Sequence, residues 1–360
     1  MKIAVGMSGG VDSSVAALLL KEAGHQVFGV SMSLWDRASE AAAAPRKHAC
    51  YGAGEAQELE TAQRICDALR IPFHVFDCAQ QYREIVLAYF QEEYQAGRTP
   101  NPCVRCNQLV KFGLLPMMIR QAGLSFDAFA TGHYARVEFQ GVAVRYALRK
   151  AKDAKKDQSY FLYRLSQEQL AQVRFPLAQY LKDDVRAIAR RAGLGVADIA
   201  ESQDFYSGDY QELLCLPDSA GEIVDVNGRV LGTHRGIWHY TIGQRKGLGI
   251  ASHEPLYVIQ LDRHANLVIV GLKDDALRAA CVVSRLNWVA IPALAAPMRV
   301  NIKLRSTHAA ADARIEPLAD DAVRVVFQTP QEAVTPGQSA VFYDGDVVVG
   351  GGVIEEHAPT

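Results

Sequence analysis

The sequence predicts an α/β protein in which a doubly wound parallel sheet is followed by two small, barrel-like β domains. Up to about residue 200, short apolar runs alternate with amphipathic helical segments, a rhythm typical of βαβ units. After Gly221, glycine turns and short alternating apolar runs replace the helical stripes. The 360 residues also exceed the roughly 250 to 300 at which a single core stops growing. We place the domains at residues 1–210, 211–278 and 279–360.

The first domain opens with a buried strand, a glycine-rich turn and a helix. Residues 2–5 form a short run of β-formers, and the apolar stripe of residues 11–23 predicts a helix. We expect further strands at 26–32, 73–76 and 127–134, and helices at 55–69, 80–95, 108–121, 167–173 and 181–192. Residues 97–107 predict a rigid loop, residues 137–148 a hairpin turning at Gln140-Gly141, and alanine-rich residues 38–44 a loop or helical turn.

The residue pattern of the last part of the chain predicts an antiparallel sheet. Five alternating segments separated by glycine-containing turns are expected to be strands. They are residues 298–304, 313–318, 323–328, 339–343 and 347–354.

The first turn has the character of an anion site. Backbone N–H groups and the positive end of the helix dipole converge there, and no bulky side chain blocks access. The turn lacks the Lys of a mononucleotide P-loop and the glycine spacing of a dinucleotide fingerprint. Ser8, Ser13 and Ser14 supply hydroxyls, and Asp12 is placed to orient the loop or Mg²⁺. Met32 ends the second strand at the same sheet edge, where it is well placed to touch an adenine.

Two of the seven cysteines stand apart from the others. Cys103 and Cys106 are three residues apart, beside Arg98 and Arg105 and before a helix, so we expect them to be favoured as thiolates. Such a pair suits a redox dithiol, half of a zinc site or part of an iron–sulfur site, although no second Cys-x-x-Cys completes a zinc site. The other five are expected to be small buried residues: Cys50, Cys66, Cys78, Cys215 and Cys281.

Composition says more about the cellular location of the protein than about its function. The net charge of −2 gives no global argument for nucleic acid. The basic residues at 150–156 precede an aromatic cluster at 160–163, a pattern that suits phosphate contact and base stacking and, taken alone, equally suits a solvated helix end. No apolar run approaches a membrane span, and the chain starts directly on a strand, so we expect a cytoplasmic protein without a disulfide framework.

Residues 8–14, Ser-Gly-Gly-Val-Asp-Ser-Ser, resemble the pyrophosphate loop of the PP-loop ATP pyrophosphatases. Together with five further segments, they identify the chain as a member of the tRNA-specific 2-thiouridylases, which make 2-thiouridine at the wobble position in the anticodon arm of tRNA. Those segments are residues 97–107, 131–134, 156–160, 240–247 and 333–343.

The resemblance implies a reaction in which ATP adenylates the uracil C2 oxygen, a thiol delivers sulfur at C2, and AMP and pyrophosphate leave. It implies Mg²⁺ and a sulfur donor such as a cysteine desulfurase or a persulfide carrier. Cys106 matches the nucleophilic cysteine, and ATP is expected at Gly6, Met7, Ser8, Gly9, Gly10, Val11, Asp12, Ser13, Met32 and Gly132. The positions matching tRNA contacts are Asn101, Pro102, Cys103, His133, Lys156, Asp157, Gln158, Arg305, Ser306 and Gln338.

One position departs from the family. Tyr206 stands where the second, persulfide-bearing cysteine is usual. Either Cys103 serves as the partner thiol of Cys106, the route we favour, or Cys50, Cys103 and Cys106 ligate a [4Fe–4S] cluster. Two other function classes stay open: a non-catalytic tRNA-binding protein that has lost its cysteine, and a PP-loop ligase that acts on a small metabolite.

Overall fold

The computed structural model describes residues 1–35, 49–141, 143–201, 204–318 and 321–355, which form two compact units. The first holds Met1–Val86, Pro102–Tyr210 and Asp346–Val348. The second holds Leu87–Asn101, Gln211–Gly345 and the chain from Val349. The alanine-rich stretch at 38–44 lies outside the described residues.

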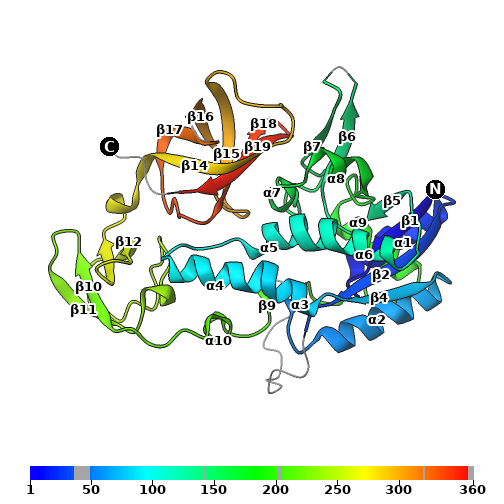
Figure 1. Ribbon diagram of the computed structural model, residues 1–360, viewed down its shortest axis with the longest axis horizontal. Coiled ribbons are helices and arrows are strands. Elements are labelled where there is room, and N and C mark those ends of the chain that lie inside the picture. Colours follow the sequence, from blue (N-terminus) through cyan, green and yellow to red (C-terminus); the bar gives the residue numbers. More distant parts are fainter. Residues whose placement is uncertain (36–48, 142, 202–203, 319–320, 356–360) are drawn as a thin grey trace. The chain divides into compact units, whose positions relative to one another are not determined.

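The elements up to residue 206 follow the predicted alternation of strands and helices (Figure 1). The strands are β1 (Lys2–Gly6), β2 (Gln26–Ser33), β3 (Ala49–Tyr51), β4 (Phe73–Asp77), β5 (Ala128–Ala130), β6 (Arg136–Gln140), β7 (Arg145–Arg149), β8 (Val173–Arg174) and β9 (Asp204–Tyr206). The α-helices are α1 (Val11–Glu22), α2 (Glu55–Ala68), α3 (Ala79–Tyr82), α4 (Ala88–Gln95), α5 (Pro102–Arg105), α6 (Leu115–Gln121), α7 (Ser159–Leu162), α8 (Gln167–Gln172) and α9 (Lys182–Arg191). Two π-helical segments are η1 (Arg83–Leu87) and η2 (Cys106–Leu114).

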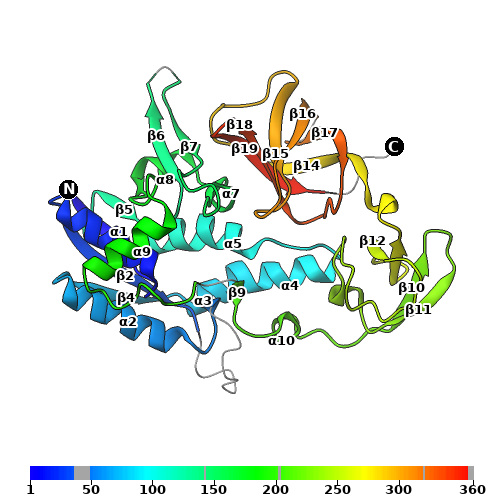
Figure 2. The same cartoon turned by 180° about the vertical axis from the view of Figure 1, so that it is seen from behind.

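The first unit is built on a parallel sheet in the order β4-β2-β1-β5-β8. Alternate residues of β1 point to opposite faces. Ile3 and Val5 join a core formed with α1, α2 and α9, whereas Phe129 of β5 packs against Phe112 of η2, with ring centroids 5.8 Å apart. Figure 2 shows α1 against β1 and β2, and α9 packs beside α1. Both faces of the sheet are covered, so the predicted doubly wound fold is confirmed.

The helix that carries the cysteines begins earlier than the sequence suggested. The predicted loop over 97–107 is wrong from residue 102 onward, because Pro102 opens α5 and η2 continues it. Proline fits the first turn of a helix, where its missing N–H would have no partner. Pro116 lies at the start of α6, where the π-helical segment passes into α-helix.

The second unit contains two β structures, as the glycine turns and short alternating apolar runs after Gly221 predicted. A four-stranded sheet in the order β11-β10-β13-β12 comes first, and a sheet in the order β14-β17-β16-β15-β18-β19 closes through pairing of β14 with β19. The strands are β10 (Gly221–Asp225), β11 (Val230–His234), β12 (Tyr257–Asp262), β13 (Leu267–Gly271), β14 (Arg278–Trp288), β15 (Met298–Lys303), β16 (Ala311–Pro317), β17 (Val323–Gln331), β18 (Ser339–Asp344) and β19 (Val347–Ile354). Short helices are α10 (Tyr210–Leu214), η3 (Ile237–His239) and η4 (Asp274–Ala276).

Candidate active site

The glycine-rich loop between β1 and α1 holds its hydroxyl groups in place through its own backbone. The N–H of Ser8 donates to Ser13 Oγ at 3.2 Å, and the N–H of Gly10 donates to Ser8 Oγ at 3.4 Å. The hydroxyls of Ser13 and Ser14 donate to the Gly10 carbonyl at 3.1 and 2.7 Å. These bonds hold the loop in one conformation at the N-terminus of a 12-residue helix, where the positive end of the helix dipole suits an anion.

Two glycines let the backbone close around this loop. Gly9 has φ of +73°, and a Cβ there would lie 2.6 Å from the Glu58 carbonyl oxygen. Gly132 follows β5, and a Cβ there would lie 2.6 Å from the carbonyl carbon of Asp12. The strand end at Gly132 thus packs directly against the first turn of α1.

We expect Gly132→Ala to weaken ATP binding, because the added methyl group must push the first turn of α1 away from β5. The midpoint of thermal unfolding is expected to fall, and the stabilisation of the protein by added ATP to shrink severalfold. Gly141→Ala is the control, since a Cβ at Gly141 meets nothing within 4 Å. Unchanged ATP stabilisation in Gly132→Ala would show that the close approach has no bearing on the nucleotide.

Asp12 is held by two partners from distant parts of the chain. Both of its carboxylate oxygens accept from Lys182 Nζ at 2.8 Å, and its Oδ1 also accepts from the Tyr134 hydroxyl at 2.9 Å. Lys182 and Tyr134 are only 7% and 2% exposed. Burial, followed by the Asp12 charge, raises the pKa of Tyr134, so the phenol stays protonated and donates. The Asp12 carboxylate is therefore fixed in one orientation.

Lys156, which was predicted to contact tRNA, forms an ion pair with Glu201. Its Nζ lies 2.6 Å from Glu201 Oε2, while Glu201 Oε1 lies 2.8 Å from Lys182 Nζ and 3.3 Å from the Arg186 guanidinium. Burial opposes ionisation of Glu201, but hydrogen bonds from Lys156 and Lys182 and their charges lower its pKa to about 2. The carboxylate is thus ionised at neutral pH and shared among three cations.

Cys103 and Cys106 lie one turn apart, in α5 and at the start of η2, so their side chains share one side of the helix. Both are partly buried. Burial raises the pKa of Cys103 and raises that of Cys106 to about 11, with Lys111 acting in the opposite direction.

The expectation of thiolates is therefore wrong, because the two arginines beside the pair in sequence turn elsewhere. The Arg105 Nε donates to the Ile85 carbonyl at 2.7 Å, and the Arg98 guanidinium binds Glu93 and Glu355 within the second unit. Neither arginine offsets the desolvation of the thiols.

This raised pKa predicts how Cys106 responds to alkylation. Since only the thiolate reacts, the rate with iodoacetamide should rise about tenfold between pH 8 and 9 and again between pH 9 and 10. Peptide mass spectrometry after timed exposure measures the modification of each cysteine separately. A rate that is already constant above pH 8 would mean that Cys106 ionises far more readily than its burial implies.

Cys50 lies on a strand that pairs with the strand carrying Tyr206. In the parallel pair β3–β9, Ala49 lies opposite Asp204, and Tyr51 lies opposite Tyr206. Tyr206 is 5% exposed, and its ring centroid is 6.0 Å from that of Tyr51. The negative charge that Cys50 can carry contributes to raising the pKa values of Cys103 and Cys106, so the three thiols share one region of the first unit.

The default interpretation of the five isolated cysteines holds for three of them. Cys66, Cys78 and Cys281 are buried, but Cys50 and Cys215 are exposed. For Cys50 the reason is its place in a three-residue strand, where Ala49 and Tyr51 take the buried side.

Residues 133 and 157–158 are tied into the protein's own structure. His133 Nδ1 lies 2.7 Å from the Thr131 hydroxyl, and burial lowers the pKa of the ring well below its ordinary value, so the imidazole is neutral. Asp157 accepts from the backbone N–H and the hydroxyl of Ser159, and Gln158 accepts from the Tyr134 N–H at 2.9 Å. These contacts support the segment that holds Tyr134 against Asp12.

In the second unit, Gln338 holds the chain that leads to the cysteine helix. Its amide donates to the carbonyls of Thr99 and Pro100 at 3.0 Å each, and the Thr99 N–H donates to the Pro336 carbonyl at 2.9 Å. Gly337 has φ of +91°, and a Cβ there would lie 2.8 Å from the Thr99 oxygen. The Thr335–Gln338 turn thereby fixes the residues just before Asn101.

Arg305, which directly precedes Ser306, is anchored in the same unit. Its guanidinium donates to the Ile242 carbonyl at 3.2 Å and to the Thr335 hydroxyl at 3.1 Å.

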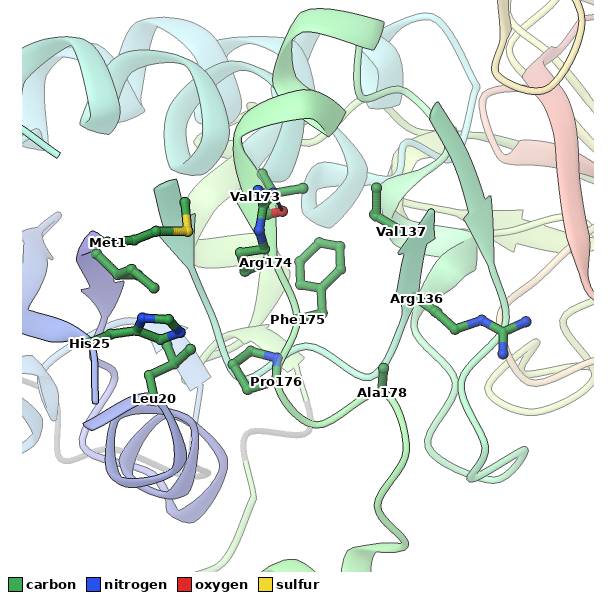
Figure 3. A pocket seen from close by; sticks show the side chains of 11 residues that line it. Met1, Leu20, His25, Arg136, Val137, Val173, Arg174, Phe175, Pro176 and Ala178 are labelled. Carbon is green, nitrogen blue, oxygen red and sulfur yellow. Dashed lines mark hydrogen bonds between the residues drawn. The ribbon is translucent and has the colours of Figure 1, made fainter. Parts of the chain in front are cut away.

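A cavity of about 250 Å³ in the first unit is separate from this site (Figure 3). Its lining includes Met1, Phe175 and Pro176, with His25 beside Leu20 and Arg136 beside Val137 in the view. Met1 and His25 precede β1 and β2, whereas the glycine-rich loop follows β1. The cavity therefore lies at the end of the sheet opposite to the candidate active site.

Lys182 and Glu201 escaped the sequence analysis. Lys182 Nζ binds a residue 170 positions earlier in the chain, and nothing in the local pattern at the start of α9 indicates such a contact. No local pattern around Glu201 indicates its contacts with three cations either. A buried lysine becomes a signal only when its burial is known.

Among the residues that the structure describes, no three His, Cys, Asp or Glu side chains are grouped closely enough to hold a metal ion. Within the same ranges, no helix has the length and apolar character needed to cross a membrane.

Three family models match the chain in succession. A tRNA methyl transferase HUP domain matches residues 1–206, a tRNA methyl transferase PRC-barrel domain matches 214–272, and an aminomethyltransferase beta-barrel domain matches 278–354.

Curated relatives match along the whole chain. The tRNA-specific 2-thiouridylase MnmA of Endomicrobium trichonymphae is 48% identical over 356 residues, 98% of this chain and 99% of that protein. The tRNA-specific 2-thiouridylase MnmA 1 of Caldanaerobacter subterraneus subsp. tengcongensis is 44% identical over 362 residues, 99% of this chain and 98% of that protein. A solved 4-thiouridine synthetase–RNA complex with bound ATP is only distantly similar, with a TM-score of 0.34 at 13% identity over 59% of this chain and 49% of that one.

Proposed function

The chain belongs to the family of tRNA-specific 2-thiouridylases, and on that premise we propose how its residues divide the reaction between ATP, tRNA and sulfur. It is an ATP-dependent tRNA sulfurtransferase. In our proposal, ATP adenylates the C2 oxygen of the wobble uridine, which turns a poor leaving group into AMP. Sulfur held on a cysteine then attacks C2.

We assign the ATP phosphates to the glycine-rich loop, from Gly6 to Ser13, and the adenosine to the neighbourhood of Met32 and Gly132. The ordered loop at the N-terminus of α1 supports this assignment, because the positive end of the helix dipole is fixed in advance and suits the charge on departing pyrophosphate. Mg²⁺ would enter with the nucleotide. The hydroxyls of Ser8 and Ser13 and the carboxylate of Asp12 are oxygen donors of the kind it prefers, and Asp12 keeps further lone pairs beside those used by Lys182.

We assign sulfur transfer to Cys106, with Cys103 as its partner thiol. Sulfur arrives as a persulfide on Cys106, supplied by a desulfurase or a persulfide carrier, and its outer sulfur bonds to C2 as AMP leaves. The Cys103 thiol then attacks Cys106 Sγ and gives up its proton to the departing 2-thiouridine, which leaves a Cys103–Cys106 disulfide. An external thiol reductant restores both thiols. The one-turn spacing of the two cysteines supports this route.

The alternative route uses Cys50, Cys103 and Cys106 as ligands of a [4Fe–4S] cluster. The three thiols share a region, but their side chains do not form a ready ligand set among the described residues, and we assign no step to a cluster. Anaerobic purification with iron and sulfide analysis separates the routes. An iron-free protein that still thiolates tRNA supports the dithiol, whereas activity that follows the iron content refutes it.

We propose that tRNA is bound by both units. In the first unit the contacts fall to Pro102, Cys103, His133 and residues 156–158. In the second they fall to Asn101, Gln338 and the Arg305-Ser306 pair. Lys156 and Arg305 carry the positive charge that phosphates require. The target base must leave its stack to reach the cysteines, as in other enzymes that act on bases.

Pyrophosphate release in the presence of unmodified tRNA, followed by mass spectrometry of the nucleosides, tests the proposal. We expect tRNA to stimulate release and 2-thiouridine to accumulate when a persulfide donor is present. Stimulation by a small metabolite instead of tRNA would favour a ligase. Binding of tRNA without turnover would favour a non-catalytic protein.

A further inference from the structure

A chain of charged groups connects the glycine-rich loop with the segment that contains Lys156. Asp12 binds Lys182, Lys182 binds Glu201 Oε1 at 2.8 Å, and Glu201 Oε2 binds Lys156 at 2.6 Å. All of these residues belong to the first unit. They come from α1, from the start of α9 and from two loops, so no single element places them together.

Lys182 is the central member of this chain. Its side chain is 9% exposed, and its ammonium group contacts carboxylates on two sides and lies 5.8 Å from the centre of the Tyr134 ring. A buried ammonium group is costly unless it is paired, so this pairing is specific and resists rearrangement. The Asp12 carboxylate is thereby both oriented and neutralised beside a loop suited to anions.

We propose that Lys182 is a positioning residue for the ATP step, holding Asp12 against the glycine-rich loop, and that Glu201 links it to Lys156. The inference rests on the proposed binding of ATP at this loop. Without Lys182, the Asp12 charge would face the polyphosphate uncompensated and with freedom to turn. MgATP would then bind less tightly, and pyrophosphate would be released more slowly. Glu201 acts one step further away, through Lys182.

The primary test compares Lys182→Met with Lys182→Arg and the wild type. In Lys182→Met we expect the Kd of MgATP, measured by calorimetry, to rise roughly 10- to 100-fold, since one charge-assisted contact is lost. The Kd for tRNA should stay within about twofold. Lys182→Arg keeps the charge and should recover at least a third of the lost affinity on a logarithmic scale. A purely structural lysine would lower the unfolding temperature without this split between the two ligands.

Two further variants examine the link through Glu201. Glu201→Gln is expected to weaken MgATP binding severalfold, because Lys182 loses its second partner. Lys156→Met is expected to weaken tRNA binding severalfold and to leave MgATP binding within about twofold. Arg190→Met is the matched control on the same helix, since Arg190 pairs with the exposed Asp198 and both Kd values should stay as in the wild type.

The double variant Asp12→Asn/Lys182→Met keeps the proposal falsifiable if the single variant unfolds, because it leaves neither charge buried alone. If Lys182 acts through Asp12, the double variant should bind MgATP no more weakly than Asp12→Asn alone. The proposal would be overturned if the losses of MgATP affinity in the two single variants added up in the double variant. It would also be overturned if the Kd of Lys182→Met for MgATP stayed within threefold of the wild type. A wild type that binds MgATP but releases no pyrophosphate with tRNA would instead refute the proposed function, while the binding data would still decide the role of Lys182.

Discussion

Cys106→Ser is expected to lose at least about a thousandfold in the rate of 2-thiouridine formation, because serine cannot carry a persulfide. Adenylation of the base needs no thiol, so release of pyrophosphate in the presence of tRNA should continue for one turnover. Binding of tRNA should stay within about twofold. Nucleoside mass spectrometry and a single-turnover pyrophosphate assay on the same sample separate the two halves of the reaction.

The control for this variant is Cys215→Ser, which changes an exposed cysteine outside the candidate site. Its rate should equal that of the wild type. Full thiolation by Cys106→Ser would transfer the sulfur chemistry to another thiol, and Cys103 would be the first to examine. Simultaneous loss of pyrophosphate release and thiolation would indicate that the cysteine supports the adenylation step instead.

Asp12→Ala is expected to slow adenylation about a hundredfold or more, since the carboxylate that orients the loop, or the magnesium ion, is lost. The fold should survive this change. Lys182 keeps Glu201 as a partner at 2.8 Å, so its ammonium group is not left buried without a counter-ion. Measurement of AMP formation at saturating tRNA, with circular dichroism to verify folding, checks both statements.

Asp183→Ala gives the matched comparison for Asp12→Ala. Asp183 also lies in the first turn of its helix, but it is exposed. Its loss should change only the favourable interaction with the helix dipole, worth about 0.3 to 1 kcal/mol, and leave AMP formation unaffected. Equal rates in the two variants would contradict the role given to Asp12.

The sequence was a reliable guide wherever the signal was local and periodic. The strand at residues 2–5, its glycine-rich turn and the following helix are found as β1, the loop and α1, because hydrophobic spacing and glycine conformation act within a few residues. The β structures after Gly221 were found for the same reason. The loop predicted over residues 97–107 was wrong from Pro102 onward, because a proline beside Asn101 and Pro100 is as typical of a loop as of a helix start.

The errors at the candidate site came from long-range structure. Arg105 stands beside Cys106 in the sequence, yet its side chain donates to the Ile85 carbonyl. Its position in the sequence therefore did not predict an effect on the pKa of Cys106. The pKa of the thiol follows burial, which involves residues distant along the chain. Lys182 was missed because its partner Asp12 lies in the opposite part of the first unit's sequence.

The contacts of Thr99 and Pro100 with the Thr335–Gln338 turn have a consequence for biosynthesis. A ribosome releases the chain from its N-terminus, and domains generally fold in that order. The stretch leading into Cys103 therefore emerges long before its anchor at Gln338 exists. Its final conformation has to wait until nearly the whole polypeptide has been translated, and a chain that stops short of that turn would carry the nucleotide loop but leave the entrance to the cysteine helix untethered.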